Sequence, residues 1–307
     1  MNDLFQRDVF IDTIYDAAKK DKNIIFVSAD FGAPALDKFR ERLPEQFIHS
    51  GISEQHMIDM SAGLALSNKK VFVYAMAPFL TLRCFEQIKC SLALMNLPVT
   101  IVSIGAGLGY ADAGPTHYTT EDVACMRSLV NLEVYSPSDE ISTKKIATLS
   151  LEKPKLRIIR LERHALPKVH KENDLIVESG YKNLIEGNDV TIISYGHMLH
   201  RAIQVCNNLK KDGVSINLID LFCIKPISKD LIYSLKKFDN IITIEEQCLD
   251  GGFGSSILEY LSDHGVKKNV KRLGLPNRYY FENGGREYLL DKYGLSINNI
   301  MKIVKEN

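Results

Sequence analysis

The segment Gly51-Ile52-Ser53-Glu54-Gln55-His56-Met57 lies between two patterns of different period. Phe47-Ile48-His49 before it predicts a strand, and the apolar and small residues after it keep helical spacing. Glu54 therefore lies where a strand ends and a helix begins, the edge at which open α/β sheets bind ligands. An acid here could cap its own helix, or it could face a partner, since an unpaired buried carboxylate is costly. Position alone leaves both interpretations open.

The same alternation of strands and helices extends on both sides of this segment. Apolar runs predict strands near residues 23–29, 70–75, 99–104, 132–136 and 156–161, separated by helical patterns. Residues 166–187 become polar and lose the pattern, which predicts a linker. The alternation then restarts, with strands expected at 190–195, 215–219 and 240–245. We therefore predict an α/β protein of two doubly wound domains, a larger one at 1–165 and a smaller one at 188–307.

Composition excludes several classes of protein. The 307 residues contain 38 Lys plus Arg and 38 Asp plus Glu, without a basic stripe, which disfavours nucleic acid and acidic membrane surfaces as partners. No apolar run is long enough for export or for a membrane span, so we expect a cytoplasmic protein. The six cysteines show no CxxC pair and no zinc-like spacing. Free thiols and no metal site in this chain are therefore predicted.

Several motifs have an ordinary structural explanation when each is taken alone. Gly105-Ala106-Gly107-Leu108-Gly109 lacks the third glycine of a dinucleotide fingerprint, because position 110 is tyrosine, and a flexible loop is predicted instead. The loop continues to Gly114-Pro115-Thr116-His117, where the histidine could simply close a turn. Phe79 and Phe85 could be core residues, and Arg160 to His164 could be a solvated strand end. For the acidic pair Glu245-Glu246 we favour an interface or helix-entry role over catalysis.

Together these motifs resemble one family. Gly51 to Met57 resembles the Gly-Ile-Ala-Glu-Gln motif of the transketolase family of thiamine-diphosphate enzymes, and Gly-Pro-Thr-His follows about sixty residues later, as it does there. Tyr135 to Glu140 and the glycines at 251–254 match further landmarks of the family in the same order. In physical terms, Tyr135 to Glu140 predicts a strand end followed by a helix N-cap. The resemblance spans nearly the whole chain. The sequence has no match to the family's Gly-Asp-Gly…Asn segment, which binds magnesium and the cofactor's diphosphate. The resemblance therefore implies that this chain is the carboxy-terminal subunit of a split enzyme.

The resemblance also implies roles for particular residues. Glu54 is expected to hydrogen-bond N1′ of the cofactor's aminopyrimidine, and Phe79, or failing that Phe85, to stack on its ring. His117 is expected to face the reacting carbon and the substrate, and Arg163 to bind a sugar phosphate. Asp30 is also expected to bind the cofactor, and Arg83 and Asp112 are expected to bind the substrate. The family's histidine and aspartate on the substrate side are replaced by Gly105 and Ala113.

The function implied is transfer of a two-carbon ketol unit between sugars or sugar phosphates. Thiamine diphosphate would be shared with a diphosphate-binding partner subunit that carries Mg²⁺, in an assembly of two chains of each kind. One alternative is acyl transfer from a 2-oxo acid, as in deoxyxylulose phosphate synthases or the beta subunits of 2-oxo acid dehydrogenases. Another is a catalytically silent subunit that regulates its partner.

Overall fold

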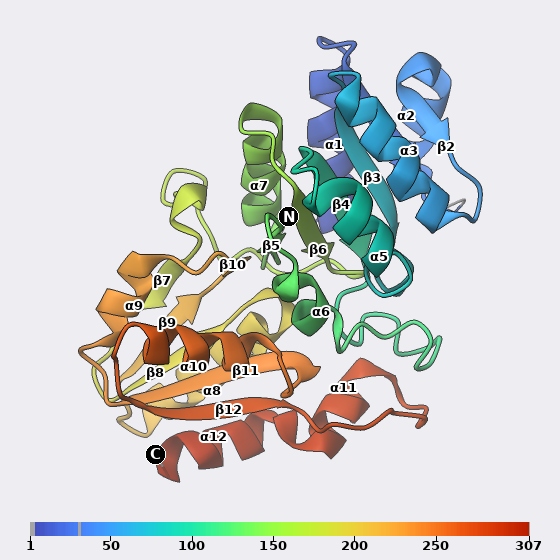
Figure 1. Ribbon diagram of the computed structural model, residues 1–307. Coiled ribbons are helices and arrows are strands. Elements are labelled where there is room, and N and C mark those ends of the chain that lie inside the picture. The colour runs from blue at the N-terminus through green and yellow to red at the C-terminus, as the bar shows by residue number, and fades with distance from the viewer. Residues whose placement is uncertain (1–3, 30–31, 307) are drawn as a thin grey trace.

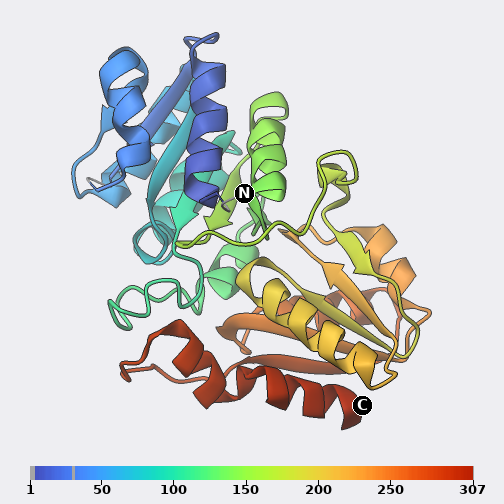
Figure 2. The same ribbon diagram turned by 180° about the vertical axis from the view of Figure 1, so that it is seen from behind.

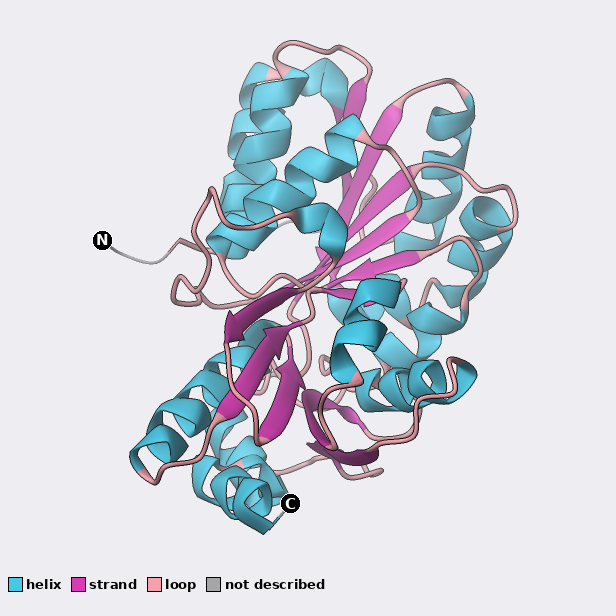
Figure 3. Ribbon diagram, turned by 90° about the vertical axis from the view of Figure 1, so that its left-hand side faces the viewer, coloured by secondary structure: helices cyan, strands magenta, loops and turns pink. Residues whose placement is uncertain are grey.

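Continuous apolar runs become the buried strands of a seven-stranded sheet in the computed structural model, which describes residues 4–29 and 32–306. Its strands β1, β4 and β6 are buried on both faces, as expected when helices cover both sides (Figure 3). Only the edge pairing between β10 and β5 is antiparallel. The strand order is β10 (Cys223–Lys225), β5 (Glu133–Tyr135), β6 (Arg157–Leu161), β4 (Val99–Ile104), β3 (Lys70–Met76), β1 (Ile24–Ser28) and β2 (Phe47–His49).

Helices cover the two faces of this first sheet (Figure 1). One face packs α1 and α7 against an aromatic core that contains Phe10, Phe26 and Phe72. The other face packs α3 and η3 against aliphatic residues such as Ile58 and Val73. The helical segments are α1 (Gln6–Ala18), η1 (Pro34–Leu36), α2 (Asp37–Arg42), η2 (Pro44–Gln46), α3 (Glu54–Leu66), α4 (Ala77–Thr81), α5 (Phe85–Gln87), η3 (Ile88–Ala93), α6 (Asp122–Ser128) and α7 (Glu140–Glu152).

A five-stranded sheet forms the second domain, in the order β12 (Asn269–Leu275), β11 (Asn240–Cys248), β8 (Val190–Ser194), β9 (Ile216–Asp220) and β7 (Lys182–Ile185). Its pairings are parallel except that of β7 with β9. The helical segments from the linker onward are η4 (Val177–Ser179), α8 (Gly196–Lys211), α9 (Lys229–Leu235), α10 (Phe253–Asp263), α11 (Gly285–Leu290), η5 (Asp291–Leu295) and α12 (Ile297–Glu306). The predicted class, two α/β domains with mostly parallel sheets, is confirmed.

Three short or polar strands were not among the sequence predictions. β12 is an edge strand whose first residues alternate between exposed and half-buried, so it has no continuous apolar run. β7 lies inside the segment predicted as a linker, so the second sheet begins before residue 188. The same segment also returns to the first domain, where Leu175 and Val177 are buried in its core. β10 comes from the second half of the chain and completes the edge of the first sheet.

The start of α7 has the helix cap that the local sequence predicts. The Asp139 side chain accepts a hydrogen bond from the backbone nitrogen of Ser142 at 2.8 Å, and the Ser142 hydroxyl bonds back to the Asp139 nitrogen. This reciprocal cap fixes the start of α7, and it confirms the cap predicted after the strand at 132–136. Among the described helices, none combines the length and the apolar character needed to cross a bilayer.

Candidate active site

Glu54 is the first residue of α3, at the carboxyl edge of the first sheet. Gly51 has a φ of +72°, a left-handed conformation that suits glycine and lets the chain turn from β2 into the helix. Glu54 is 3% exposed. Its Oε2 accepts a hydrogen bond of 2.6 Å from Nη1 of Arg83, a residue beyond α4. The carboxylate therefore faces across the sheet edge rather than back to its own helix.

Phe79, Arg83 and His117 gather around this carboxylate. The Arg83 guanidinium lies 4.2 Å from the centroid of the Phe79 ring, and the His117 ring approaches the same phenyl ring edge-to-face at 5.3 Å. Phe79 belongs to α4, directly after β3, and His117 to the long loop after β4. Neighbouring parallel strands end at the same edge of a sheet, which explains how residues far apart in sequence meet here.

A pocket of about 200 Å³ opens beside Glu54. Its described lining is mostly apolar, and Glu54 is the only charged side chain among the described residues Ala29, Gly32, Ile52, Glu54, Ala75, Met76 and Phe79. A second pocket of about 560 Å³ also borders Glu54 and is lined by Ile52 and Arg83 among others. An apolar pocket with a carboxylate and an aromatic side chain suits a heteroaromatic ring that has a hydrogen-bonding nitrogen on its edge.

The loop between β4 and α6 brings a second group of predicted residues together. Arg163 bonds to Asp112 and lies 4.4 Å above the ring of Tyr110. Arg163 also holds the pKa of the Asp112 carboxyl below its usual range. Tyr110 in turn lies 6.3 Å from His117, ring to ring, so it connects the arginine to the histidine. The sequence analysis did not assign a role to Tyr110, although an aromatic residue next to the glycine-rich loop was a usable signal.

Two predicted site residues stand apart from this cluster. Phe85 packs against the aliphatic core under α3, together with neighbours such as Leu80 and Ile88, and it does not line the pocket beside Glu54. Asp30 lies outside the described residues. Of the predicted site residues in the described part of the chain, the structure thus brings together Glu54, Phe79, Arg83 and His117, with Asp112 and Arg163 adjoining them through Tyr110.

A second set of charged residues lies between the two domains, and for only one of them, Glu246, did the sequence suggest an interface or helix-entry role. Arg160 bonds to Asp122 through two nitrogens, at 2.6 and 3.0 Å. Arg286 on α11 bonds to Glu162, which directly follows β6, and to Glu246 on β11. The cavity beside Arg160, Glu162 and Glu246 has a volume of about 10 Å³, at the lower limit for a single water molecule. We call Asp122, Arg160, Glu162, Glu246 and Arg286 the interdomain charge cluster.

Glu245, the neighbour of Glu246, has the helix-entry role expected from the sequence. Its two carboxylate oxygens accept hydrogen bonds from the backbone nitrogens of Phe253 and Gly254, at 2.6 and 2.7 Å, where α10 begins. Burial raises its pKa to about 7, although the two backbone donors oppose the shift. Within residues 4–29 and 32–306, no group of three or more His, Cys, Asp or Glu is arranged to hold a metal ion.

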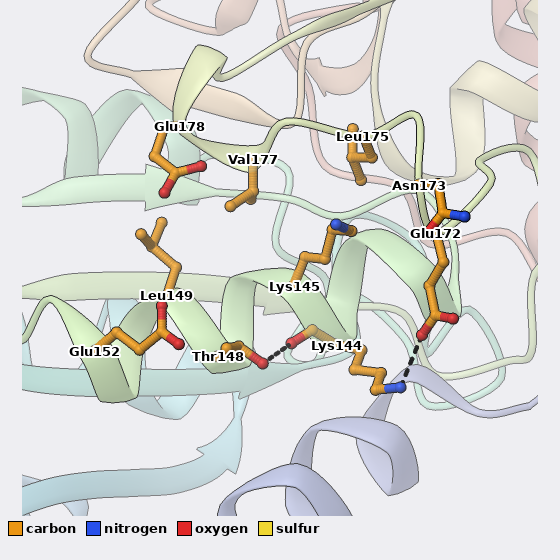
Figure 4. A pocket seen from close by; sticks show the side chains of 10 residues that line it. All are labelled: Lys144, Lys145, Thr148, Leu149, Glu152, Glu172, Asn173, Leu175, Val177 and Glu178. Atoms are coloured by element: carbon orange, nitrogen blue, oxygen red, sulfur yellow. Dashed lines mark hydrogen bonds and ion pairs between the residues drawn. The ribbon is translucent and has the colours of Figure 1, made fainter.

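One further pocket, of about 410 Å³, lies between α7 and the segment that follows the first domain (Figure 4). Lys144, among its lining residues, pairs with Glu172 at 2.8 Å, and Lys153, just after the end of α7, pairs with Glu178 at 3.0 Å. Such exposed pairs contribute little to binding or stability. The pocket shares no lining residue with the Glu54 pocket, and we assign no function to it.

The fold and the Glu54 pocket define a class of protein, an α/β protein with a ligand-sized pocket at the carboxyl edge of a parallel sheet. Residues 5–168 match the transketolase pyrimidine binding domain, and residues 180–300 match the transketolase C-terminal domain. The chain therefore belongs to the transketolase family. The described lining of its pocket fits the aminopyrimidine ring of thiamine diphosphate, the cofactor of that family, because it offers apolar walls, an aromatic face and a carboxylate.

The similar proteins fall into two groups, one about as long as this chain and one much longer. An apulose-4-phosphate transketolase subunit of Phocaeicola vulgatus is 34% identical over 98% of this chain and 96% of its own length. A putative transketolase C-terminal section of Methanocaldococcus jannaschii is 32% identical over 96% and 93%. The solved structure of a split gene transketolase, described as an inactive beta4 tetramer, superposes with a TM-score of 0.88 at 28% identity, covering 99% of this chain and 98% of that one.

The 1-deoxy-D-xylulose-5-phosphate synthase of Aquifex aeolicus represents the longer relatives. It is 31% identical over 97% of this chain, but the match covers only 48% of the synthase. The chain thus corresponds to about half of such enzymes and to nearly all of the separate transketolase sections.

Proposed function

We propose that this chain is the carboxy-terminal subunit of a split, thiamine-diphosphate-dependent transketolase. With a diphosphate-binding partner subunit it would transfer a two-carbon ketol unit between sugars or sugar phosphates. The observation that carries the proposal is the buried Glu54 carboxylate at the edge of an apolar pocket, with Phe79 beside it. The names of two relatives, a transketolase subunit and a transketolase C-terminal section, support the division of the enzyme into two chains.

Each residue of the site has a task in this proposal. Bound thiamine diphosphate would supply the carbon nucleophile that accepts the ketol unit from a ketose. Glu54 would share a proton with the ring nitrogen of the aminopyrimidine, and so act as a general acid–base group at that atom. Phe79 would pack against the ring, and His117 would hydrogen-bond a substrate oxygen. Arg163 would bind a substrate phosphate through its planar fork, because two parallel hydrogen bonds orient such a group.

The partner subunit would hold the diphosphate and Mg²⁺, since the motif for them has no counterpart in this sequence. A two-plus-two assembly is part of the proposal, and the similar solved structure described as a tetramer shows that a related chain can associate. A cytoplasmic location is also proposed, because all six cysteines are unpaired, as is usual in a reducing compartment.

Acyl transfer from a 2-oxo acid is the second candidate. The synthase relatives, at about the same identity as the transketolase sections, favour it specifically. Arg83 also matches an arginine that the synthases place near their substrate, and here it contacts both Glu54 and Phe79. A silent regulatory subunit has less support, because such a subunit has no need for an acid in a ring-sized pocket.

Reconstitution tests the proposal. The chain is co-expressed with a diphosphate-binding chain that carries the Gly-Asp-Gly…Asn segment, and thiamine diphosphate binding with Mg²⁺ is measured by calorimetry on each chain and on the mixture. We expect tight binding only in the mixture, followed by ketol transfer from ketose phosphates to an aldose. Turnover of pyruvate in place of ketoses would establish the second candidate, and cofactor binding without any turnover would establish the regulatory role.

A further inference from the structure

The loop that carries His117 has a closed base, formed by residues 105–107 and 119–120, which we call the neck. The Thr119 nitrogen donates to the Gly107 carbonyl at 2.9 Å, and the Thr119 hydroxyl donates to the Gly105 carbonyl at 3.1 Å. The Gly105 nitrogen donates to the carbonyl of Leu161, at the end of β6. The neck is buried, so the flexible loop predicted from the glycines is not what the structure shows at residues 105–109.

The second domain holds the neck from the other side. Gln247 donates from Nε2 to the Thr119 carbonyl at 2.6 Å, and the Cys248 nitrogen donates to the Thr120 carbonyl at 2.8 Å. Figures 1 and 2 both show the loop between β4 and α6 beside α11. The position of the loop is therefore set by both domains and not by the first domain alone.

Glu246 is in direct contact with the neck at Gly107. A Cβ atom on Gly107 would lie 2.2 Å from Oε2 of Glu246, and Gly107 has a φ of +59°, so glycine is required there on both counts. Any displacement of the Glu246 carboxylate would therefore displace the neck or leave a gap beside it. This contact makes the orientation of Glu246 relevant to the residues farther along the loop.

Arg286 holds the Glu246 carboxylate in this orientation. It also bonds to Glu162, the residue before Arg163. Its Nε bonds to Oε1 of Glu246 at 2.7 Å, and its Nη1 bonds to Oε2 of Glu162 at 2.6 Å. Glu162 immediately precedes Arg163 in the chain. Burial disfavours the Glu162 charge, but Arg286 outweighs burial and lowers the pKa of that carboxyl. Without the arginine, two buried carboxylates would repel each other.

We propose that Arg286 is a positioning residue for the substrate end of the site, acting on the His117 loop through Glu246 and on Arg163 through Glu162. The proposal rests on the proposed function, and it gives the second domain a part in substrate recognition. A planar fork suits this task, because it holds two carboxylates in one fixed geometry, which a lysine cannot do. Displacements of about 1 Å can cost up to about 100-fold in rate, so small shifts of His117 and Arg163 would be measurable.

The test compares Arg286→Lys with Arg157→Lys in the complex with the partner subunit. Arg157 is the matched control, because it is also buried and carboxylate-bound, to Glu133 at 2.6 Å, but it lies at the opposite end of β6 from Arg163. For Arg286→Lys we expect kcat/KM to fall roughly 10- to 100-fold, mainly through a higher KM for the phosphorylated sugar. Thiamine diphosphate affinity should stay within about twofold of wild type, since Arg286 bonds to Glu162 and Glu246 and not directly to Glu54 or Phe79.

A second measurement does not depend on turnover. With carbon-13-labelled histidine in the isolated chain, the His117 ring signals, assigned by loss in His117→Asn, should shift in Arg286→Lys and stay in place in Arg157→Lys. Unchanged His117 signals, or equal losses of kcat/KM in the two lysine variants, would overturn the positioning role. If Arg286→Lys does not fold, Glu246→Gln is submitted to the same two measurements. A wild-type complex without ketol transfer would refute the proposed function, and the histidine signals would still decide the role of Arg286.

Discussion

Glu54 and Glu246 are two buried glutamates near strand ends, 3% and 6% exposed, in very different surroundings. The bonded partner of Glu54 is Arg83, whose side chain is 42% exposed, and the carboxylate borders a pocket of about 200 Å³. Glu246 is held by Arg286, whose side chain is only 10% exposed, and the space beside Glu246 is about 10 Å³. The comparison teaches that a strand-end acid is a candidate for ligand binding only when space remains beside it. In the interdomain charge cluster, the same pairing of a glutamate with an arginine joins the two domains.

The largest expected effect concerns Glu54. Glu54→Ala should reduce turnover of the reconstituted complex by about 10²–10⁴-fold, the usual span for a general acid–base group. The midpoint of thermal unfolding should change little, because Arg83 can return to solvent. Asp59→Asn, at the next acid along α3, serves as the control and should keep near-normal turnover. Near-normal turnover of Glu54→Ala with bound cofactor would show that Glu54 does not serve the reaction.

The next effect concerns stability in the interdomain charge cluster. Asp122→Ala should lower the free energy of unfolding by about 3–5 kcal/mol, because it leaves Arg160 buried without its carboxylate. An exposed pair gives the contrast, since Lys153→Ala, which removes the partner of the exposed Glu178, should cost only about 0–1 kcal/mol. Urea denaturation of both variants measures the difference. Equal losses would mean that burial does not distinguish the two regions.

A pH dependence of stability is expected from Glu245. Its pKa is about 7 in the folded chain, against an ordinary 4.5, so between these values the folded chain binds a proton that the unfolded chain has released. Protonation thus stabilises the fold, and this contribution is lost as the pH rises through 7. Relative to Glu245→Gln, the wild type should lose on the order of 3 kcal/mol between pH 4.5 and 8. Parallel stability curves in urea denaturation at several pH values would contradict the assignment.

The smallest effect distinguishes Phe79 from Phe85. Phe79→Ala should weaken thiamine diphosphate binding by the complex by roughly 1 kcal/mol, about the contribution of an aromatic pair. Phe85→Ala should leave that affinity unchanged and lower the midpoint of thermal unfolding, because Phe85 packs against the core. Calorimetric titration and thermal unfolding of both variants decide between them. The reverse pattern would transfer the stacking role to Phe85.

Local signals in the sequence were sufficient for part of this structure. The strand-to-helix junction at Glu54 and the cap of α7 at Asp139 depend on neighbouring residues, and both were predicted. β10 could not be predicted in this way, because three residues become a strand only when the edge of β5 is available. The hydrogen bond from Gln247 to Thr119 joins residues 128 positions apart, so no local sequence pattern could predict it. The family resemblance named Glu54, Phe79 and His117, and the structure shows how closely they approach one another.

The pairing of β10 with β5 has a consequence for anyone who divides this chain. A fragment that ended at residue 165 would lose Cys223–Lys225 and expose Glu133–Tyr135 as a bare sheet edge. Unprotected edges of this kind recruit other strands, so such a fragment should associate with itself and precipitate. The smallest portion that can be transplanted or redesigned as an independent module is therefore the pair of domains together.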